Sequence, residues 1–232
     1  MVIAFQDITY SYNSGPPVLE KFSMTAESGE TTVFLGPSGC GKSTLARLAC
    51  GLLRPQIGRV LVSHEAARPG LVRGVLFQDD TLVPWLSVVE NAVFGAKHRQ
   101  PEEHLAAVGL AGAENKLPHE LSAGMKKRLE FVRAKLSDDK FLIADEPFSG
   151  LDFHQRRVLW QAWRDVMRHE KRTAMLITHD LDEAISLGNR LIVLSGRTPT
   201  RIVADARVPE ASDAQSRSLV SDIERALIEA AG

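Results

Sequence analysis

Short apolar runs and stripes of helical spacing alternate along most of the chain. Runs of strand length occur at 3–10, 31–35, 60–62, 75–77, 141–144, 174–178 and 191–194. Apolar residues at helical spacing follow in 45–53, 159–166 and 218–230. Strands that alternate with helices favour a mostly parallel sheet covered by helices on its faces.

The middle of the chain has a different pattern. Its apolar residues recur at steps of three and four, at Leu121, Met125, Leu129, Val132 and Leu136. This spacing is typical of an amphipathic helix. We therefore predict one domain over 1–232, with a core formed by 1–78 and 137–232 and a helical subdomain at 79–136.

A glycine-rich segment follows the second strand. It fits the pattern G-x-x-x-x-G-K-[ST] between a predicted strand and a predicted helix. Glycines let backbone N–H groups surround a polyphosphate, Lys42 adds a charge at the β- and γ-phosphates, and Ser43 offers a hydroxyl to Mg²⁺. An empty glycine-rich turn is the alternative, which the strand–loop–helix context disfavours. The residues predicted to bind are Gly36, Pro37, Ser38, Gly39, Cys40, Gly41, Lys42, Ser43 and Thr44.

Two carboxylates end the apolar run at 141–144. Asp145 is predicted to hold a metal ion, and Glu146 is predicted to polarise an attacking water as a general base. A polar strand end without function is the alternative, and it is weak beside a phosphate-binding loop. The loop alone does not choose among ATPases, GTPases and small kinases.

Composition, charge and cysteine count limit which binding partners and which structural classes fit the chain. The chain has 232 residues, 44% hydrophobic and 25% charged, with a net charge of -1, so no global basic field favours nucleic acid. Cys40 and Cys50 have no metal-ligand spacing and form no disulfide framework. The N-terminus is unlike a signal peptide and no apolar run is long enough to span a bilayer, so a role at a membrane would need a partner.

Further segments occur in an order that resembles the ABC ATPase family. They are Gln78 after a strand, the signature-like 121–125, the segment 149–152 after Glu146, and His179 at the end of a strand. The resemblance implies an α/β fold: a P-loop NTPase core with a mostly parallel sheet, a small antiparallel β lobe and a helical insertion. It also implies ATP and Mg²⁺ as cofactors.

The resemblance assigns roles residue by residue. It implies that Tyr12 stacks on adenine and that Gln78 senses Mg²⁺ and water. His179 would contact the γ-phosphate, while the signature would close the nucleotide of a second subunit. The implied catalytic residues are Glu146, His179, Gln78 and Lys42, the implied metal ligands are Ser43, Gln78 and Asp145, and further nucleotide contacts are Ser122, Ala123, Gly124 and Asp152.

Segments 77–91 and 195–203 resemble the nitrate, sulfonate and taurine importer group. This implies a bacterial importer: a dimer with a second copy or a homologous subunit, peripheral on the cytoplasmic face of the inner membrane. A permease would contact Val83, Pro84, Trp85 and Leu86, and a periplasmic solute-binding protein would complete the complex. An exporter or lipid-transport ATPase, a soluble ABC ATPase and a scaffold that does not hydrolyse remain alternatives.

The sequence also departs from the resembling family. Its signature has Ala123 and Met125 where LSGGQ has glycine and glutamine. The methyl group of Ala123 is expected to crowd the nucleotide or to require a small backbone shift. Glu130 and Lys135 replace apolar residues, which predicts a wetter helix face or a particular partner. For Trp85, packing within the chain is the alternative to an interface.

Overall fold

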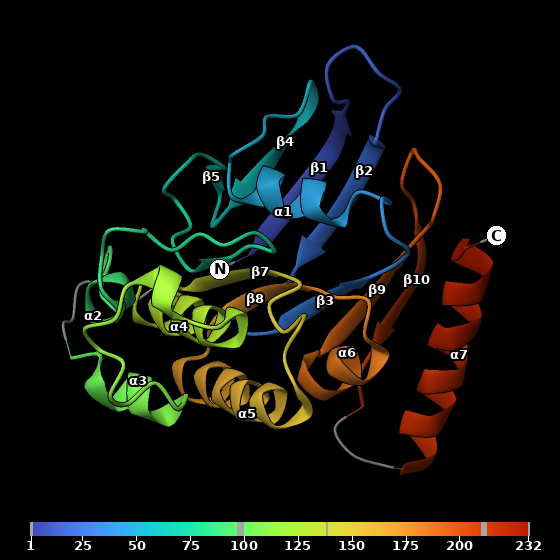
Figure 1. Ribbon diagram of the computed structural model, residues 1–232. Helices are drawn as coiled ribbons and strands as arrows, with labels where there is room; N and C mark the ends of the chain where they lie inside the picture. Colours follow the sequence, from blue (N-terminus) through green and yellow to red (C-terminus); the bar gives the residue numbers. More distant parts are fainter. Residues whose placement is uncertain (1, 97–99, 138, 210–212, 232) are drawn as a thin grey trace.

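The computed structural model describes residues 2–96, 100–137, 139–209 and 213–231, which form two sheets and their covering helices (Figure 1). The larger sheet has the strand order β10-β9-β3-β8-β7-β6. Its members are β3 (Thr31–Leu35), β6 (Val75–Leu76), β7 (Phe141–Asp145), β8 (Thr173–Ile177), β9 (Arg190–Leu194) and β10 (Ile202–Arg207). β10 is antiparallel to β9, and the other neighbours are parallel.

The smaller sheet is antiparallel, with the order β2-β1-β4-β5. Its members are β1 (Ile3–Tyr10), β2 (Leu19–Ala26), β4 (Ile57–Val62) and β5 (Glu65–Ala66). The sequence predicted such a lobe, but the strand of 19–26 was missed. Glu20 and Lys21 interrupt its apolar pattern because both point to solvent.

Helices form two further layers. α1 (Lys42–Ala49) lies between the two sheets, and the helices on the other face of the larger sheet are those of the middle region together with α5 and α6 (Figure 1). These are α2 (Val88–Ala92), α3 (Glu102–Ala107), a 3₁₀ turn (Pro118–Glu120), α4 (Ala123–Leu136), α5 (Phe153–Glu170) and α6 (Leu181–Leu187). The last helix, α7 (Asp213–Ala231), packs beside β9 and β10.

Side chains point alternately to the two faces along the parallel strands, so the hydrophobic core consists of two clusters, one on each face of the larger sheet. Phe34 of β3 faces α1 and the antiparallel sheet, whereas its neighbours Val33 and Leu35 face the helical layer. β7, β8 and β9 follow the same rule, because successive strand residues point to opposite faces. The strands are therefore buried on both faces, and their carboxyl ends carry the polar residues of the site.

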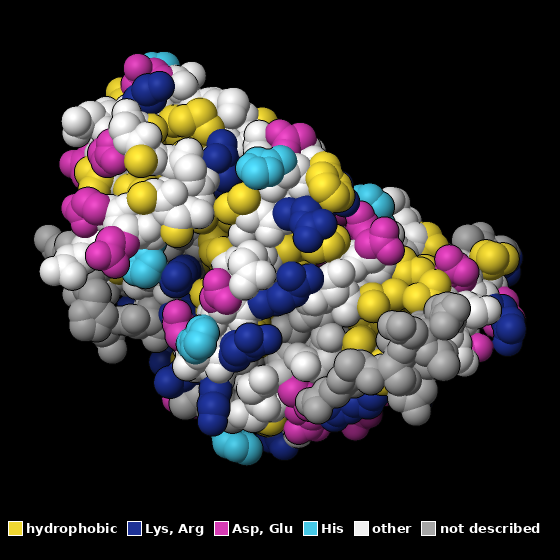
Figure 2. Space-filling view, turned by 90° about the horizontal axis from the view of Figure 1, so that it is seen from below, with side chains coloured by type: hydrophobic (Ala, Val, Ile, Leu, Met, Phe, Trp, Pro, Cys, Tyr) yellow, Lys and Arg dark blue, Asp and Glu magenta, His cyan; other side chains and the backbone are white. Residues whose placement is uncertain are grey.

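The outer helices bury one stripe each. α5 buries Leu159, Trp163 and Val166, while its arginines at 157, 164 and 168 are exposed. Seen from below Figure 1, Lys and Arg side chains gather near the middle of the surface (Figure 2). Within the described ranges, no helix combines the length and the apolar character that a membrane crossing requires.

Two sequence predictions change in detail. The first helix was predicted over 45–53, but α1 starts at Lys42 and its chain turns at Gly51 with φ 70°. Glu130 is 1% exposed and lies inside the helical layer, so the predicted wetter helix face is wrong at this position. Its carboxylate accepts hydrogen bonds from Thr81 instead.

Candidate active site

The phosphate-binding loop connects β3 to α1 at the carboxyl edge of the larger sheet. Gly41 caps α1 with φ 98°, and a Cβ there would lie 2.9 Å from a methyl group of Val18 and 3.0 Å from the Thr200 hydroxyl. Only glycine combines this backbone conformation with this close approach. The loop therefore presents N–H groups and the start of α1 to the cleft, an arrangement that suits a phosphate.

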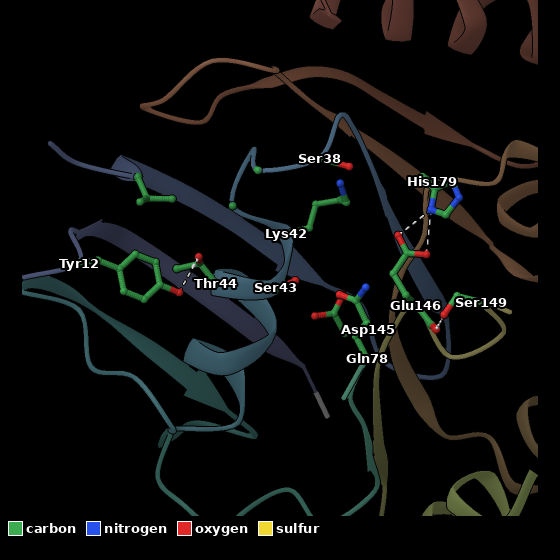
Figure 3. A pocket seen from close by; sticks show the side chains of 13 residues that line it. Tyr12, Ser38, Lys42, Ser43, Thr44, Gln78, Asp145, Glu146, Ser149 and His179 are labelled. Atoms are coloured by element: carbon green, nitrogen blue, oxygen red, sulfur yellow. Dashed lines mark hydrogen bonds and ion pairs between the residues drawn. The ribbon is translucent and has the colours of Figure 1, made fainter. Parts of the chain in front are cut away.

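Lys42 is held against its own loop. Its Nζ donates to the carbonyl oxygens of Gly36, at 2.6 Å, and Pro37, at 2.9 Å. The side chain is 8% exposed and lines the cleft beside Ser38 (Figure 3). Cys40 is buried behind the loop, where desolvation raises the pKa of its thiol. The loop thus places one ammonium group at the bottom of the cleft and keeps the thiol out of it.

Asp145 ends β7 and lines the cleft together with Ser43, the second residue of α1. Burial raises the pKa of Asp145, and its buried Oδ1 has no hydrogen-bond partner among the described residues. A cation beside Ser43 would satisfy this oxygen, so the residues fit Mg²⁺. The described chain offers no cluster of three His, Cys, Asp or Glu side chains, so phosphate and water oxygens would complete the shell.

Glu146 follows in a left-handed backbone conformation, with φ 52°. This costs roughly 1–2 kcal/mol for a residue other than glycine, and such strain is concentrated at functional sites. The turn directs the carboxylate to His179, whose Nδ1 lies 2.8 Å from it (Figure 3). The structure thereby brings together the proposed base and the histidine that ends the β8 segment.

Tyr12 lies at the opposite end of the cleft. Its hydroxyl shares a hydrogen bond of 3.1 Å with the Thr44 hydroxyl, and its ring packs edge-on against Tyr10 at 5.1 Å between centroids. The side chain is 41% exposed, so it can offer a ring face to a flat base.

These groups line one cleft with a volume of about 530 Å³. Its lining is Tyr12, Val18, Ser38, Gly39, Gly41, Lys42, Ser43, Thr44, Gln78, Asp145, Glu146, Ser149 and His179. Val18 and Ser149 were not predicted as site residues. Val18 had no sequence signal because it reaches the cleft only through the packing of β2 beside the loop.

The signature residues lie elsewhere in the described chain, outside this lining. Ser122 caps α4 by accepting from the Met125 N–H at 3.3 Å, and both Ser122 and Ala123 are exposed. Gly124 packs against Gln155, which donates to Asp152 at 2.6 Å. The predicted nucleotide contacts at 122–124 and 152 therefore form a second, outward-facing group within one chain.

A buried carboxylic acid lies beside the site, on α6. Glu183 is 4% exposed, and its Oε1 lacks a hydrogen-bond partner in the part of the chain that the structure describes. Burial raises its pKa to about 8, although the Thr178 side chain partly opposes this. Glu183 is consequently a neutral group at neutral pH, close to Asp180 and Glu146.

Comparisons with known proteins agree with this geometry. The family described as ABC transporter matches residues 19–149. A taurine import ATP-binding protein of Burkholderia pseudomallei is 44% identical over 196 residues, which cover 80% of this chain and 75% of that protein. An aliphatic sulfonates import ATP-binding protein of Bacillus licheniformis is 39% identical over 192 residues, with the same two coverages.

A solved structure supports the fold. It is a dimeric ATP-binding cassette in a post-hydrolysis state with ADP and Pi, and it matches with a TM-score of 0.80. The identity is 23%, over 90% of this chain and 100% of that one. The predicted fold class is confirmed by this likeness. The family match and the import ATP-binding relatives show that the chain belongs to the ABC transporter family, as an ATP-binding and ATP-hydrolysing subunit.

Proposed function

We propose that this chain is the motor subunit of a bacterial importer of small sulfonates such as taurine. Two copies would close around two Mg²⁺–ATP molecules and drive a membrane permease, which is loaded by a solute-binding protein. The hydrolytic part rests on one observation: Glu146 and His179 face the phosphate-binding loop across a single cleft. The solute class rests on the relatives that are named as taurine and sulfonate import proteins.

The residues have distinct tasks in hydrolysis. Lys42 and the loop N–H groups would bind the phosphates, and Tyr12 would support the adenine. Glu146 would take a proton from the attacking water, while His179 keeps that carboxylate oriented. Mg²⁺ beside Ser43 and Asp145 would neutralise charge on the phosphates, with Gln78 on the same wall of the cleft.

A second copy would complete each site. Ser122 and Ala123, at the start of α4, are exposed and lie outside the cleft of their own chain. The start of a helix of 14 residues suits a phosphate, and a two-fold axis would place it on the partner's nucleotide. Hydrolysis would remove the bridging phosphate and allow the dimer to open.

Ala123→Gly tests the contact of the signature. Because the methyl group is exposed at the first turn of α4, its removal should leave the fold intact and relieve crowding at the phosphate. We expect a kcat equal to or above that of the wild type, measured as phosphate release at saturating ATP. A large loss of turnover would show that the methyl group is required.

The surface next to Gln78 suits a permease. An apolar groove of about 320 Å³ is lined by Val75, Phe77, Thr81, Phe94 and Gly95, with Arg73, Arg133 and Ser137. Trp85 lies in the sequence between Thr81 and Phe94, which both line this groove, and it is 76% exposed. Packing of Trp85 into the chain's own core, the alternative from the sequence, is therefore wrong. We propose that a helical segment of the permease contacts 83–86 and the groove.

Trp85→Ala tests the proposed function. We expect unchanged folding, with less than about 0.5 kcal/mol of stability lost, because the side chain is exposed. Binding to the permease should weaken roughly 30-fold if the indole is an interface anchor. The measurement is ATP-dependent taurine uptake into vesicles that contain the permease and the solute-binding protein, together with the basal ATPase rate.

Ile228→Ala is the matched control. Its side chain is 74% exposed but belongs to α7, far from 83–86 in the sequence. We expect full uptake from this variant. Uptake of neither taurine nor an alkanesulfonate by the wild-type complex would refute the solute class, and full uptake by Trp85→Ala would refute the docking surface.

A further inference from the structure

Charged side chains of α4 hold the segment that follows β6. Lys127 Nζ donates to the carbonyl oxygens of Phe77, at 2.9 Å, and Gln78, at 2.8 Å. Lys126 forms an ion pair of 2.7 Å with Asp80, more exposed than the Lys127 contacts. The backbone around Gln78 is thus attached to the helix that starts at the signature.

The attachment with the most hydrogen bonds is at Thr81, which both Glu130 and Arg133 of α4 contact. Glu130 Oε1 accepts from the Thr81 N–H at 2.7 Å and from its hydroxyl at 2.9 Å. Arg133 donates to the Thr81 carbonyl oxygen at 2.8 Å and also to the hydroxyl. Every polar atom of Thr81 is therefore bound by α4.

Helical spacing explains why one face of α4 can do this. Positions 127, 130 and 133 are three residues apart and lie near one another on the helix surface. Glu130 is 1% exposed, and its Oε2 lies 3.5 Å from Lys127 Nζ. A carboxylate this buried is costly unless cations and donors surround it. Such groups contribute little net stability even when they are paired.

We propose that Glu130 is a positioning residue that makes the Gln78 segment and the signature helix move as one unit. Because Ser122 caps the start of α4, a shift of Gln78 at one nucleotide would displace the residues that face the other nucleotide. Glu130 would then couple the two ATP sites of the dimer. This inference rests on the proposed function as a dimer. It adds Glu130 as the residue that transmits the state of one nucleotide site to the other.

Three variants separate this role from mere structural support. Glu130→Ala removes the acceptor of the Thr81 hydrogen bonds, and Glu130→Gln keeps one oxygen there. Lys126→Ala is the matched control, since it breaks an exposed ion pair between the same helix and the same segment. Each full-length variant is assayed for kcat, for ATP affinity and for amide exchange of the peptide that contains Thr81.

We expect Glu130→Ala to lower kcat roughly 2- to 30-fold, the range of a lost coupling contact. ATP affinity should change by less than about twofold, because the phosphate-binding loop lies in the other part of the core. The Thr81 amide should exchange faster. Glu130→Gln should recover at least half of the turnover, and Lys126→Ala should behave like the wild type.

Unchanged kcat in Glu130→Ala, or no recovery in Glu130→Gln, would refute this inference and would leave the proposed function standing. A parallel fall of kcat, ATP affinity and melting temperature would also refute it, since that is the result of a destabilised fold. If Glu130→Ala fails to fold, Thr81→Val replaces it, because it removes the bound hydroxyl and keeps the N–H. A wild-type chain without ATP turnover would refute the proposed function as well.

Discussion

Glu146→Gln should abolish ATP turnover and leave ATP binding intact. The amide keeps the shape of the side chain but cannot take a proton from water, so kcat should fall by roughly 10²–10⁴-fold. The affinity for ATP should stay within about twofold, because the phosphate contacts lie on the loop and α1. Phosphate release and equilibrium binding of a fluorescent ATP analogue measure the two quantities.

The same variant should accumulate as an ATP-bound dimer, since the bridging γ-phosphate remains. Light scattering with and without ATP detects this. Glu65→Gln, in the exposed β5 strand away from the cleft, is the control and should hydrolyse ATP normally. Wild-type phosphate release from Glu146→Gln would place the base on another residue.

Lys42→Ala should remove most of the ATP affinity. A hydrogen bond to a charged group is worth roughly 1.5–3 kcal/mol, so the Kd for ATP should rise about 10- to 150-fold. The variant also leaves the Gly36 and Pro37 carbonyl oxygens without the ammonium that binds them. Loop geometry and charge are therefore lost together. Isothermal titration with Mg²⁺–ATP measures the effect.

Lys116→Ala is the control for the lost positive charge. Lys116 is exposed and lies in the helical region, so its loss should not alter the Kd. An unchanged affinity in Lys42→Ala would show that the glycine-rich loop is not the phosphate site. A melting curve identical to that of the wild type would show that the loss is local.

The sequence predicted the strands best where both of their faces are buried. The bounds 31–35 agree with β3, whose five residues are all buried, because a short buried run is visible without tertiary information. The bounds 3–10 also agree with β1, although Gln6 and Asp7 are exposed in it. β2, α6 and β10 were missed. Charged side chains at exposed positions interrupt their patterns, and only their pairing or packing partners elsewhere in the chain define them.

Residues that line the cleft could be predicted from the sequence where they are adjacent in it. The loop 36–44 and the pair Asp145–Glu146 carry their chemistry in one short motif each. Val18 enters the cleft through long-range packing, which no local pattern reveals. Glu130 shows the same limit: its charge indicated a wet surface, but its carboxylate is buried and accepts hydrogen bonds from Thr81, a residue far away in the sequence.

Glu183 makes the stability of the fold depend on pH. Its pKa is about 8 in the folded chain and 4.5 ordinarily, so between these values folding takes up a proton. The unfolded chain binds fewer protons there, so this group lowers the free energy of unfolding as the pH rises through this range. The loss is complete above pH 8. Alkaline medium therefore favours local opening of α6, the helix that follows His179.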